Sequence, residues 1–260
     1  MPMSSAELRL VINRHCEWID SGGKTGERAE MSGENLSRAE LQDARLQNAD
    51  LSEAILSGVR FQDANLQGAN LQRARLYEAN FRDANLQDAD LSGAPLQRAL
   101  FRGANLKNAN LAPADLELAD LTNADLSGAR LPRATLRGAN LRDATLCGTD
   151  LRKSDLQDAN LLNADLKGAN LRGANLQGAN FQGADLRNAD LQSARLQNAD
   201  LVQADLRCAS FIKARMQNAD LYKANIENSD LRGADLRNAV GFTGRHIGQA
   251  RTDETTRIHE

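Results

Sequence analysis

The chain of 260 residues carries 32 Lys or Arg and 35 Asp or Glu, which gives a formal net charge of −3 at pH 7. This balance indicates neither a basic nucleic-acid-binding protein nor a strongly acidic one. Aromatic residues make up only 3% of the chain, so something regular must replace a core built from large rings.

The first element that the sequence predicts is a helix over residues 5–20. Ser4 or Ser5 supplies its N-cap, the pair Gly22 and Gly23 ends it, and its apolar residues recur at helical spacing: Leu8, Val11, Ile12 and Ile19. Because a repeat fold exposes its core at both ends, residues 1–28 are predicted to be a capping helix and lead-in that cover the first repeat. His15 and Trp18 are interpreted as structural residues of this cap.

Residues 29–238 divide into 42 consecutive pentapeptides without an insertion or deletion. We call the large apolar residue of each pentapeptide position i. It is Leu in 34 repeats and Met, Phe or Ile in the other eight: Met31, Phe61, Phe81, Phe101, Phe181, Phe211, Met216 and Ile226. Position i−2 is Ala in 37 repeats, the exceptions being Glu34, Val59, Thr149, Ser154 and Ser229. Position i is therefore predicted to be buried, and i−2 must be small.

A period of five fits neither an amphipathic helix nor a flat strand, because in both of them successive Leu side chains would point in different directions. The chain must therefore turn in every repeat. In an extended segment residues two apart share a face, so i−2 and i point inward, whereas i−1 and i+1 point to solvent. All thirteen glycines within the repeats stand at i+2, which marks that position as the corner.

The phenylalanines indicate how many repeats form one coil. Phe61, Phe81 and Phe101 follow one another at intervals of four repeats, and Phe181 falls in the same register. This spacing predicts four repeats per coil with stacked rings, hence about ten and a half coils and a rod about 50 Å long. The predicted core includes Leu36, Leu41, Phe61, Phe81, Phe101, Leu121, Leu141, Leu161, Phe181 and Phe211.

The recurring pattern A-(D/N)-L-x-x, seen as Ala104-Asn105-Leu106-Lys107-Asn108, resembles the pentapeptide-repeat proteins over about four-fifths of the chain. The resemblance implies an all-β solenoid, a right-handed quadrilateral β-helix, here with a short N-terminal capping helix and a short C-terminal cap. Some members of this family are acidic rods that imitate DNA and bind type II topoisomerases. The resemblance thus implies DNA mimicry as one function to test.

Residues 239–260 are predicted to form a C-terminal cap and tail, because the repeat pattern fails at Gly241. We expect a closing segment over residues 242–250 and a polar tail over residues 252–256. One column of outward-facing apolar side chains is expected beside them: Val202, Tyr222 and Phe242. This strip either packs against the cap or forms a homodimer contact, so a monomer and a C-terminal-contact homodimer both stay open.

The sequence offers no constellation for catalysis. All three histidines, at positions 15, 246 and 259, lie outside the repeats, so they build neither a Ser-His-Asp triad nor a metal site. We therefore predict that the protein is not an enzyme and has no catalytic residue, cofactor or metal ion. Cys16, Cys147 and Cys208 form no CxxC pair and leave an odd one over, which favours a reducing compartment. Without a signal-peptide pattern or a membrane-spanning stretch, we expect a cytoplasmic location and no membrane partner.

Charge on the surface is nearly even. The four columns of outward-facing residues carry −3, −1, +1 and +1, so no face has the dense negative charge that DNA mimicry requires. Asp43, Asp63 and Asp83 stack at corners, where they are either solvated or hold a cation or a basic peptide. A basic cluster is either a solvated charge mixture or the binding surface for an anionic partner: Arg130, Arg133, Arg152, Lys153 and Arg172.

The region over residues 95–132 departs most from the outward pattern, with five residues in place of polar ones: Pro95, Leu100, Pro113, Leu118 and Pro132. Either the wall is tolerant there, or Leu100 and Leu118 mark a contact patch. The predicted function is a non-catalytic interaction scaffold, a rigid rod that presents side-chain ladders to an unknown protein partner and does not bind nucleic acid directly. The alternative is a DNA-mimicking inhibitor or protector of a type II topoisomerase.

Overall fold

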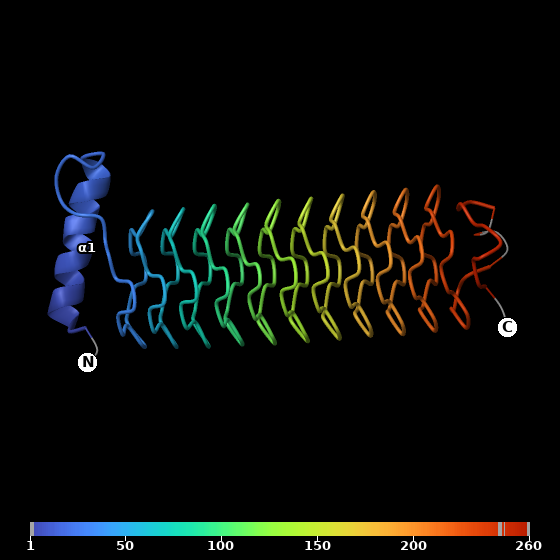
Figure 1. Ribbon diagram of the computed structural model, residues 1–260, viewed down its shortest axis with the longest axis horizontal. Coiled ribbons are helices and arrows are strands. Elements are labelled where there is room, and N and C mark those ends of the chain that lie inside the picture. Colours follow the sequence, from blue (N-terminus) through green and yellow to red (C-terminus); the bar gives the residue numbers. More distant parts are fainter. Residues whose placement is uncertain (1–2, 244–245, 247, 259–260) are drawn as a thin grey trace.

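Stacked coils form a straight rod, and helix α1 (Ser5–Asp20) lies across its N-terminal end (Figure 1). The computed structural model describes residues 3–243, 246 and 248–258. Parallel bridges join each paired residue to the one four repeats later, from Glu30 with Asp50 to Asp220 with Val240. One coil therefore contains four pentapeptides, as the phenylalanine register predicts.

Every repeat turns at positions i+1 and i+2. The i+2 residue has positive φ at 41 of the 42 corners, of which 13 are glycines and 28 are other residues, and the exception is Pro113. A turn of this kind, with positive φ at its third residue only, is a type II turn. Val, Ile and Thr occur at none of the i+2 positions, because a β-branched side chain is strongly strained at positive φ.

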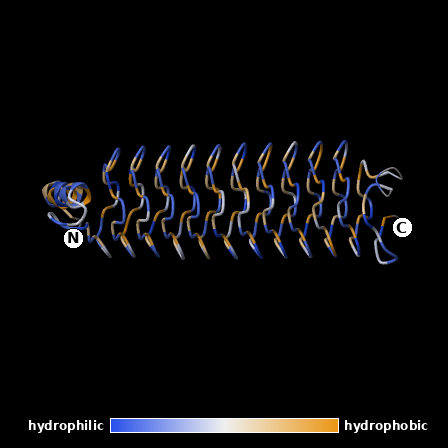
Figure 2. Ribbon diagram, turned by 90° about the horizontal axis from the view of Figure 1, so that it is seen from above, coloured by the Kyte–Doolittle hydropathy of each residue, from blue (hydrophilic) through white to orange (hydrophobic). Residues whose placement is uncertain are grey.

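The turns explain why the described residues contain isolated bridges and no strand. Two of every five residues form the corner, so only position i−1 lies extended and forms a β-bridge with the neighbouring coil. The prediction of β-structure is thus realised as single paired residues repeated along the rod, and not as strands. Figure 2 shows polar and apolar residues alternating along each coil.

All 42 residues at position i are buried, none with more than 3% of its surface exposed. This includes all ten members of the predicted core set. The rings of Phe61 and Phe81 stack with centroids 5.2 Å apart, and those of Phe81 and Phe101 at 4.8 Å. The core is therefore a continuous column along the axis of the rod.

Asp and Asn at position i−1 stabilise the turn, a role that was not predicted from their outward position. All 28 of them accept a hydrogen bond from the backbone N–H two residues on, as in Ser52 N–H to Asp50 Oδ1 at 2.9 Å. Several Asn side chains also donate to the coil before, for example Asn105 to Asn85 at 3.0 Å. These groups hold the turn in shape, as Asx turns do.

Helix α1 begins with a capping box between Ser4 and Glu7. Leu8 is buried against the first coil, and His15 is fully buried. The Nδ1 atom of His15 accepts the backbone N–H of Ala29 at 3.1 Å, which fastens the helix to the start of the repeats.

The C-terminal segment continues the rod with a shifted period. Asp230 pairs with Arg251 and Asp235 with Arg257, so the regular interval of four repeats grows first by one residue and then by two. Asp253 accepts the backbone N–H of Gly233 at 3.1 Å. The expected polar tail over residues 252–256 therefore caps the last coil, because its side chains bind the backbone groups that this coil leaves open.

The closing segment predicted over residues 242–250 includes 244, 245 and 247, which lie outside the described residues. Phe242 is only 9% exposed and stacks on His246 with centroids 5.6 Å apart. The prediction that Phe242 faces outward was wrong. Gly241, with φ of 74°, redirects the chain after Val240, and the ring turns inward over the end of the core.

Candidate partner-binding face

The five basic residues predicted as a cluster lie on one side of the rod, in three successive coils. Arg130 pairs with Asp150, and Asp150 with Asn170, which sets the register of this side. Arg133 and Lys153 stand at corners with φ of 61° and 57°. All five basic side chains are exposed: Arg130, Arg133, Arg152, Lys153 and Arg172.

Two of these cations form ion pairs. Arg152 binds Asp150 at 2.7 Å, and Arg172 binds Asp190 at 3.3 Å. The hydrogen bond from Arg152 lowers the pKa of Asp150 below its ordinary value and raises the pKa of Arg152. Within the part of the chain that the structure describes, the other three make no ion pair, although the charge of Arg130 also helps to lower the pKa of Asp150. The positive charge without an acidic neighbour is therefore that of Arg133 and Lys153.

Pro113 interrupts the regular wall beside this cluster. Its ring holds φ near −65°, so it cannot adopt the positive φ of the other corners. The turn bond from the N–H of residue i+3 to the carbonyl of residue i is formed in 41 of 42 repeats, and the missing one is Ala114 to Leu111. The cross-coil bond from Gly93 N–H to the Ala112 carbonyl is absent as well. Proline thus removes hydrogen bonds from two neighbouring coils.

A hollow of about 380 Å³ lies at this interruption. Its floor is apolar, and its rim carries the positive charge of the cluster. The lining residues are Ala112, Pro113, Pro132, Arg133, Arg152 and Lys153. The structure therefore joins two features that the sequence presented separately, namely the proline-containing region and the basic cluster. Ala112 was not predicted as a member, although the register of four repeats per coil places it beside Pro132.

Leu118 and Leu100, the predicted contact patch, lie elsewhere. Leu118 occupies the next corner after Pro113 and is 52% exposed, with φ of 57°. Its side chain covers Gly138 of the following coil, where an added Cβ would lie 2.9 Å from the Leu118 Cδ2 atom. Leu100 is half-buried on the following side of the coil. One side of the rod separates these leucines from the hollow, so they do not extend it.

Negative charge on the rod is held close to backbone and to cations. On one side, Asp165, Asp185 and Asp205 alternate with Lys167, Arg187 and Arg207, and the N···O distances run from 2.6 to 3.6 Å. The corner ladder Asp43, Asp63 and Asp83 is regular, with φ between 56° and 58°. Among the described residues, no group of three or more His, Cys, Asp or Glu is arranged to hold a metal ion.

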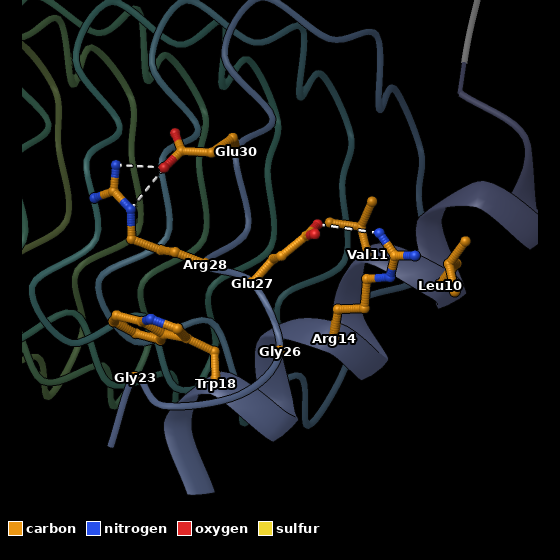
Figure 3. A pocket seen from close by; sticks show the side chains of 9 residues that line it. All are labelled: Leu10, Val11, Arg14, Trp18, Gly23, Gly26, Glu27, Arg28 and Glu30. Carbon is orange, nitrogen blue, oxygen red and sulfur yellow. Dashed lines mark hydrogen bonds and ion pairs between the residues drawn. The ribbon is translucent and has the colours of Figure 1, made fainter. Parts of the chain in front are cut away.

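A second hollow, of about 540 Å³, lies between α1 and the lead-in to the first coil (Figure 3). Its charged residues pair with one another, Arg14 with Glu27 at 3.1 Å and Arg28 with Glu30 at 2.6 Å. Trp18 stacks on His15 with centroids 5.5 Å apart. Because these groups already have partners inside the cap, we interpret this hollow as the junction between the helix and the rod.

At the C-terminal end, Tyr222 is 54% exposed, and the Lys223 ammonium lies 5.1 Å from the centre of its ring. Val202 is half-buried in the same column. Since Phe242 turns inward, the expected three-residue apolar strip is reduced to Val202 and Tyr222. The cap and homodimer interpretations of this strip both remain predictions.

The cysteines are free: Cys16, Cys147 and Cys208. Burial raises the pKa of the Cys147 thiol, and hydrogen bonding to Asp165 adds to the effect. This thiol is therefore a poor nucleophile at neutral pH. In the described part of the chain, no helix combines the length and apolar character needed to cross a bilayer.

The chain matches two family models, both of pentapeptide repeats. The model for pentapeptide repeats matches in eight copies over residues 96–138, 134–173, 169–207 and 200–238. The model for a pentapeptide repeat region matches residues 34–111. A search of the curated proteins finds no match.

Among solved structures, the chain is similar to HetL, a pentapeptide repeat protein involved in heterocyst differentiation regulation from the cyanobacterium Nostoc sp. strain PCC 7120. The two share 35% identity and a TM-score of 0.56, over 90% of this chain and 97% of HetL. QnrB1, a plasmid-mediated fluoroquinolone resistance protein, is 21% identical with a TM-score of 0.36, over 73% of this chain and 90% of QnrB1. The likeness to HetL implies the right-handed quadrilateral β-helix. By its repeats, its coil register and these matches, the chain belongs to the pentapeptide-repeat family.

Proposed function

We propose that the protein is a non-catalytic interaction scaffold, a rigid rod that binds a protein partner through the basic side around Pro113. The observation that carries this proposal is the uncompensated charge of Arg133 and Lys153 beside an apolar hollow. Many acidic groups elsewhere on the rod bind backbone or cations. A surface with free charge and an apolar floor is the kind that a partner can recognise.

The alternative, inhibition or protection of a type II topoisomerase by DNA mimicry, has weaker support. A mimic must present a dense row of negative charge to its target. Here the Asp residues at i−1 accept backbone hydrogen bonds, and the row from Asp165 to Asp205 is neutralised by interleaved cations. A supercoiling assay with purified protein tests this function, and inhibition at micromolar concentration would restore it.

Non-catalytic action is supported by the regularity of the rod. The Asp and Asn side chains at i−1 are engaged in hydrogen bonds to the backbone of the turn beside them. HetL is involved in the regulation of heterocyst differentiation, and a regulatory role of that kind fits binding. We propose the cytoplasm as the compartment, which three free cysteines support. The partner is proposed to be a protein, with no direct binding of nucleic acid and no membrane.

The experiment is capture of partners from native extract with the wild-type rod and two charge-reversed variants. In the first, Arg133→Glu and Lys153→Glu change the basic side. In the matched control, Arg98→Glu and Lys213→Glu change two other corners with φ of 58° and 57°. We expect one protein to be retained by the wild type and the control and lost by the first variant. Equal retention by all three rods, or none by any, contradicts the proposal.

A further inference from the structure

We infer that the hollow at Pro113 binds an extended acidic peptide segment of the partner, with an apolar side chain on its floor and carboxylates at its rim. This inference rests on the proposed function and names the chemistry of the ligand. It is carried by three properties of the hollow and the coil before it: open backbone groups, an apolar floor, and free cations.

The open backbone groups come from the proline. In a regular corner the N–H of residue i+2 binds the carbonyl of residue i+1 in the next coil. Pro113 has no N–H to donate to the Pro132 carbonyl, and the Gly93 N–H and the Ala112 carbonyl are not bonded to each other. In the described part of the chain, these three backbone groups therefore have no hydrogen-bond partner. An extended peptide carries both donors and acceptors and can pair with such groups, as in strand addition.

The floor selects for an apolar side chain. Ala112, Pro113 and Pro132 present carbon atoms in a hollow of about 380 Å³, which is enough for one or two side chains. A free inorganic anion would gain nothing from this surface. The ligand therefore combines apolar and acidic groups.

The rim selects for carboxylates. Arg133 and Lys153 stand at the same corner of successive coils, about 4.8 Å apart along the rod. The Lys153 side chain lies over Gly173 of the next coil, where an added Cβ would be 3.6 Å from the Lys153 Cγ atom. The glycine therefore leaves room for the aliphatic part of Lys153 along the wall. Arg152 is already held by Asp150 and serves as a wall of the hollow. Two free cations at this spacing suit the acidic side chains of one extended segment.

A peptide fits this site better than a nucleic acid does. A nucleic acid requires a continuous run of cations along its phosphates. Here Arg152 and Arg172, the next cations in the same column, are already paired with Asp150 and Asp190, so the run of free positive charge is short. The positive charge is therefore confined to the neighbourhood of the hollow.

The test is fluorescence anisotropy with a labelled ten-residue peptide in which Glu alternates with Leu or Ser, and with the same peptide carrying Gln for every Glu. We expect the acidic peptide to bind the wild-type rod at least tenfold more tightly than the Gln peptide. The double variant Arg133→Ala, Lys153→Ala should weaken binding at least tenfold. Pro113→Gly, which keeps every charge but restores the corner, should do the same. The matched control Arg98→Ala, Lys213→Ala should stay within twofold of the wild type.

Three outcomes would overturn the inference: no binding of the acidic peptide, binding that Pro113→Gly leaves unchanged, or equal competition by a single-stranded oligonucleotide. The last two outcomes would mean that binding depends on positive charge alone and not on the hollow. Pro113→Gly is expected to fold at least as well as the wild type, so loss of binding in this variant cannot be ascribed to unfolding. A partner captured equally by the wild type and Pro113→Gly would overturn this inference alone, whereas capture of no partner would overturn the proposed function.

Discussion

The Nδ1 atom of His15 accepts the backbone N–H of Ala29 at 3.1 Å, so a buried imidazole joins the capping helix to the first coil. Burial lowers the pKa of His15 below its ordinary value of 6.5, the charges of Arg28 and Arg45 act in the same direction, and the Gln47 carbonyl opposes them. Protonation at Nδ1 would remove the acceptor. The neutral ring is therefore the form that holds the cap.

We expect the cap to loosen on acidification. Because the pKa is lower in the folded chain, the unfolded chain takes up the proton first as the pH falls. The stability that His15 contributes is fully present above pH 6.5 and is lost as the pH falls toward the folded pKa. Trp18, the one tryptophan of the chain, stacks on His15, so its fluorescence reports the change. The signal should shift as the pH is lowered from 6.5 through the folded pKa of His15, in the wild type and in His246→Gln, and stay constant in His15→Gln. A shift that persists in His15→Gln would contradict this assignment.

The stacked rings of the core predict a steep dependence on volume. Phe81 lies between Phe61 and Phe101 and is fully buried. Phe81→Ala should lower the free energy of unfolding by about 3–5 kcal/mol, because the rigid coils on both sides cannot collapse into the space. Phe81→Leu should cost only about 1–2 kcal/mol, since Leu121 and Leu141 fill the same column elsewhere. Denaturant titration of both variants measures the difference, and equal losses would argue against a column held at fixed spacing.

The register of the rod was predictable from the phenylalanines, and the inward positions from Leu and Ala, because both follow from burial alone. The role of Asp and Asn at i−1 was not, since an outward position suggests a solvated side chain until the turn geometry shows the backbone N–H beside it. The C-terminal continuation also escaped prediction. The one- and two-residue shifts at Arg251 and Arg257 break the period from which the coils were predicted.

The hollow at Pro113 illustrates the same limit. In the sequence, each residue of the hollow is only a local departure from the pattern of its own repeat. They become one site when coils of four repeats are stacked, which brings Ala112 and Pro113 beside Pro132 and Arg133. The loss of the hydrogen bond at Gly93, one coil earlier, emerges only from the placement of both coils.

Corner geometry predicts a second stability effect. Asn123 has φ of 58°. Asn123→Val should lower the free energy of unfolding by about 1–2 kcal/mol, because a β-branched side chain clashes with its own backbone at positive φ. Asn123→Gly, the matched control, should change stability by less than about 0.5 kcal/mol, as glycine adopts this conformation freely. Thermal unfolding of the two variants provides the comparison, and a Val variant as stable as the Gly variant would mean that the corner is not held at positive φ.

Replacing Pro113 with Gly should stabilise the rod. Glycine can adopt positive φ, so the bonds from Ala114 to Leu111 and from Gly93 to Ala112 can form, and the new N–H can bind the Pro132 carbonyl. At about 1 kcal/mol for each hydrogen bond, the gain is about 3 kcal/mol, against about 1 kcal/mol for the greater freedom that Gly gives the unfolded chain. The net increase in the free energy of unfolding is therefore about 2 kcal/mol. The reverse change one coil earlier, Gly93→Pro, should lower stability, because a regular corner with φ of 69° would be lost. If Pro113→Gly instead lowered the denaturation midpoint, the proline would be a stabilising part of the wall, and the hollow would not arise from missing hydrogen bonds.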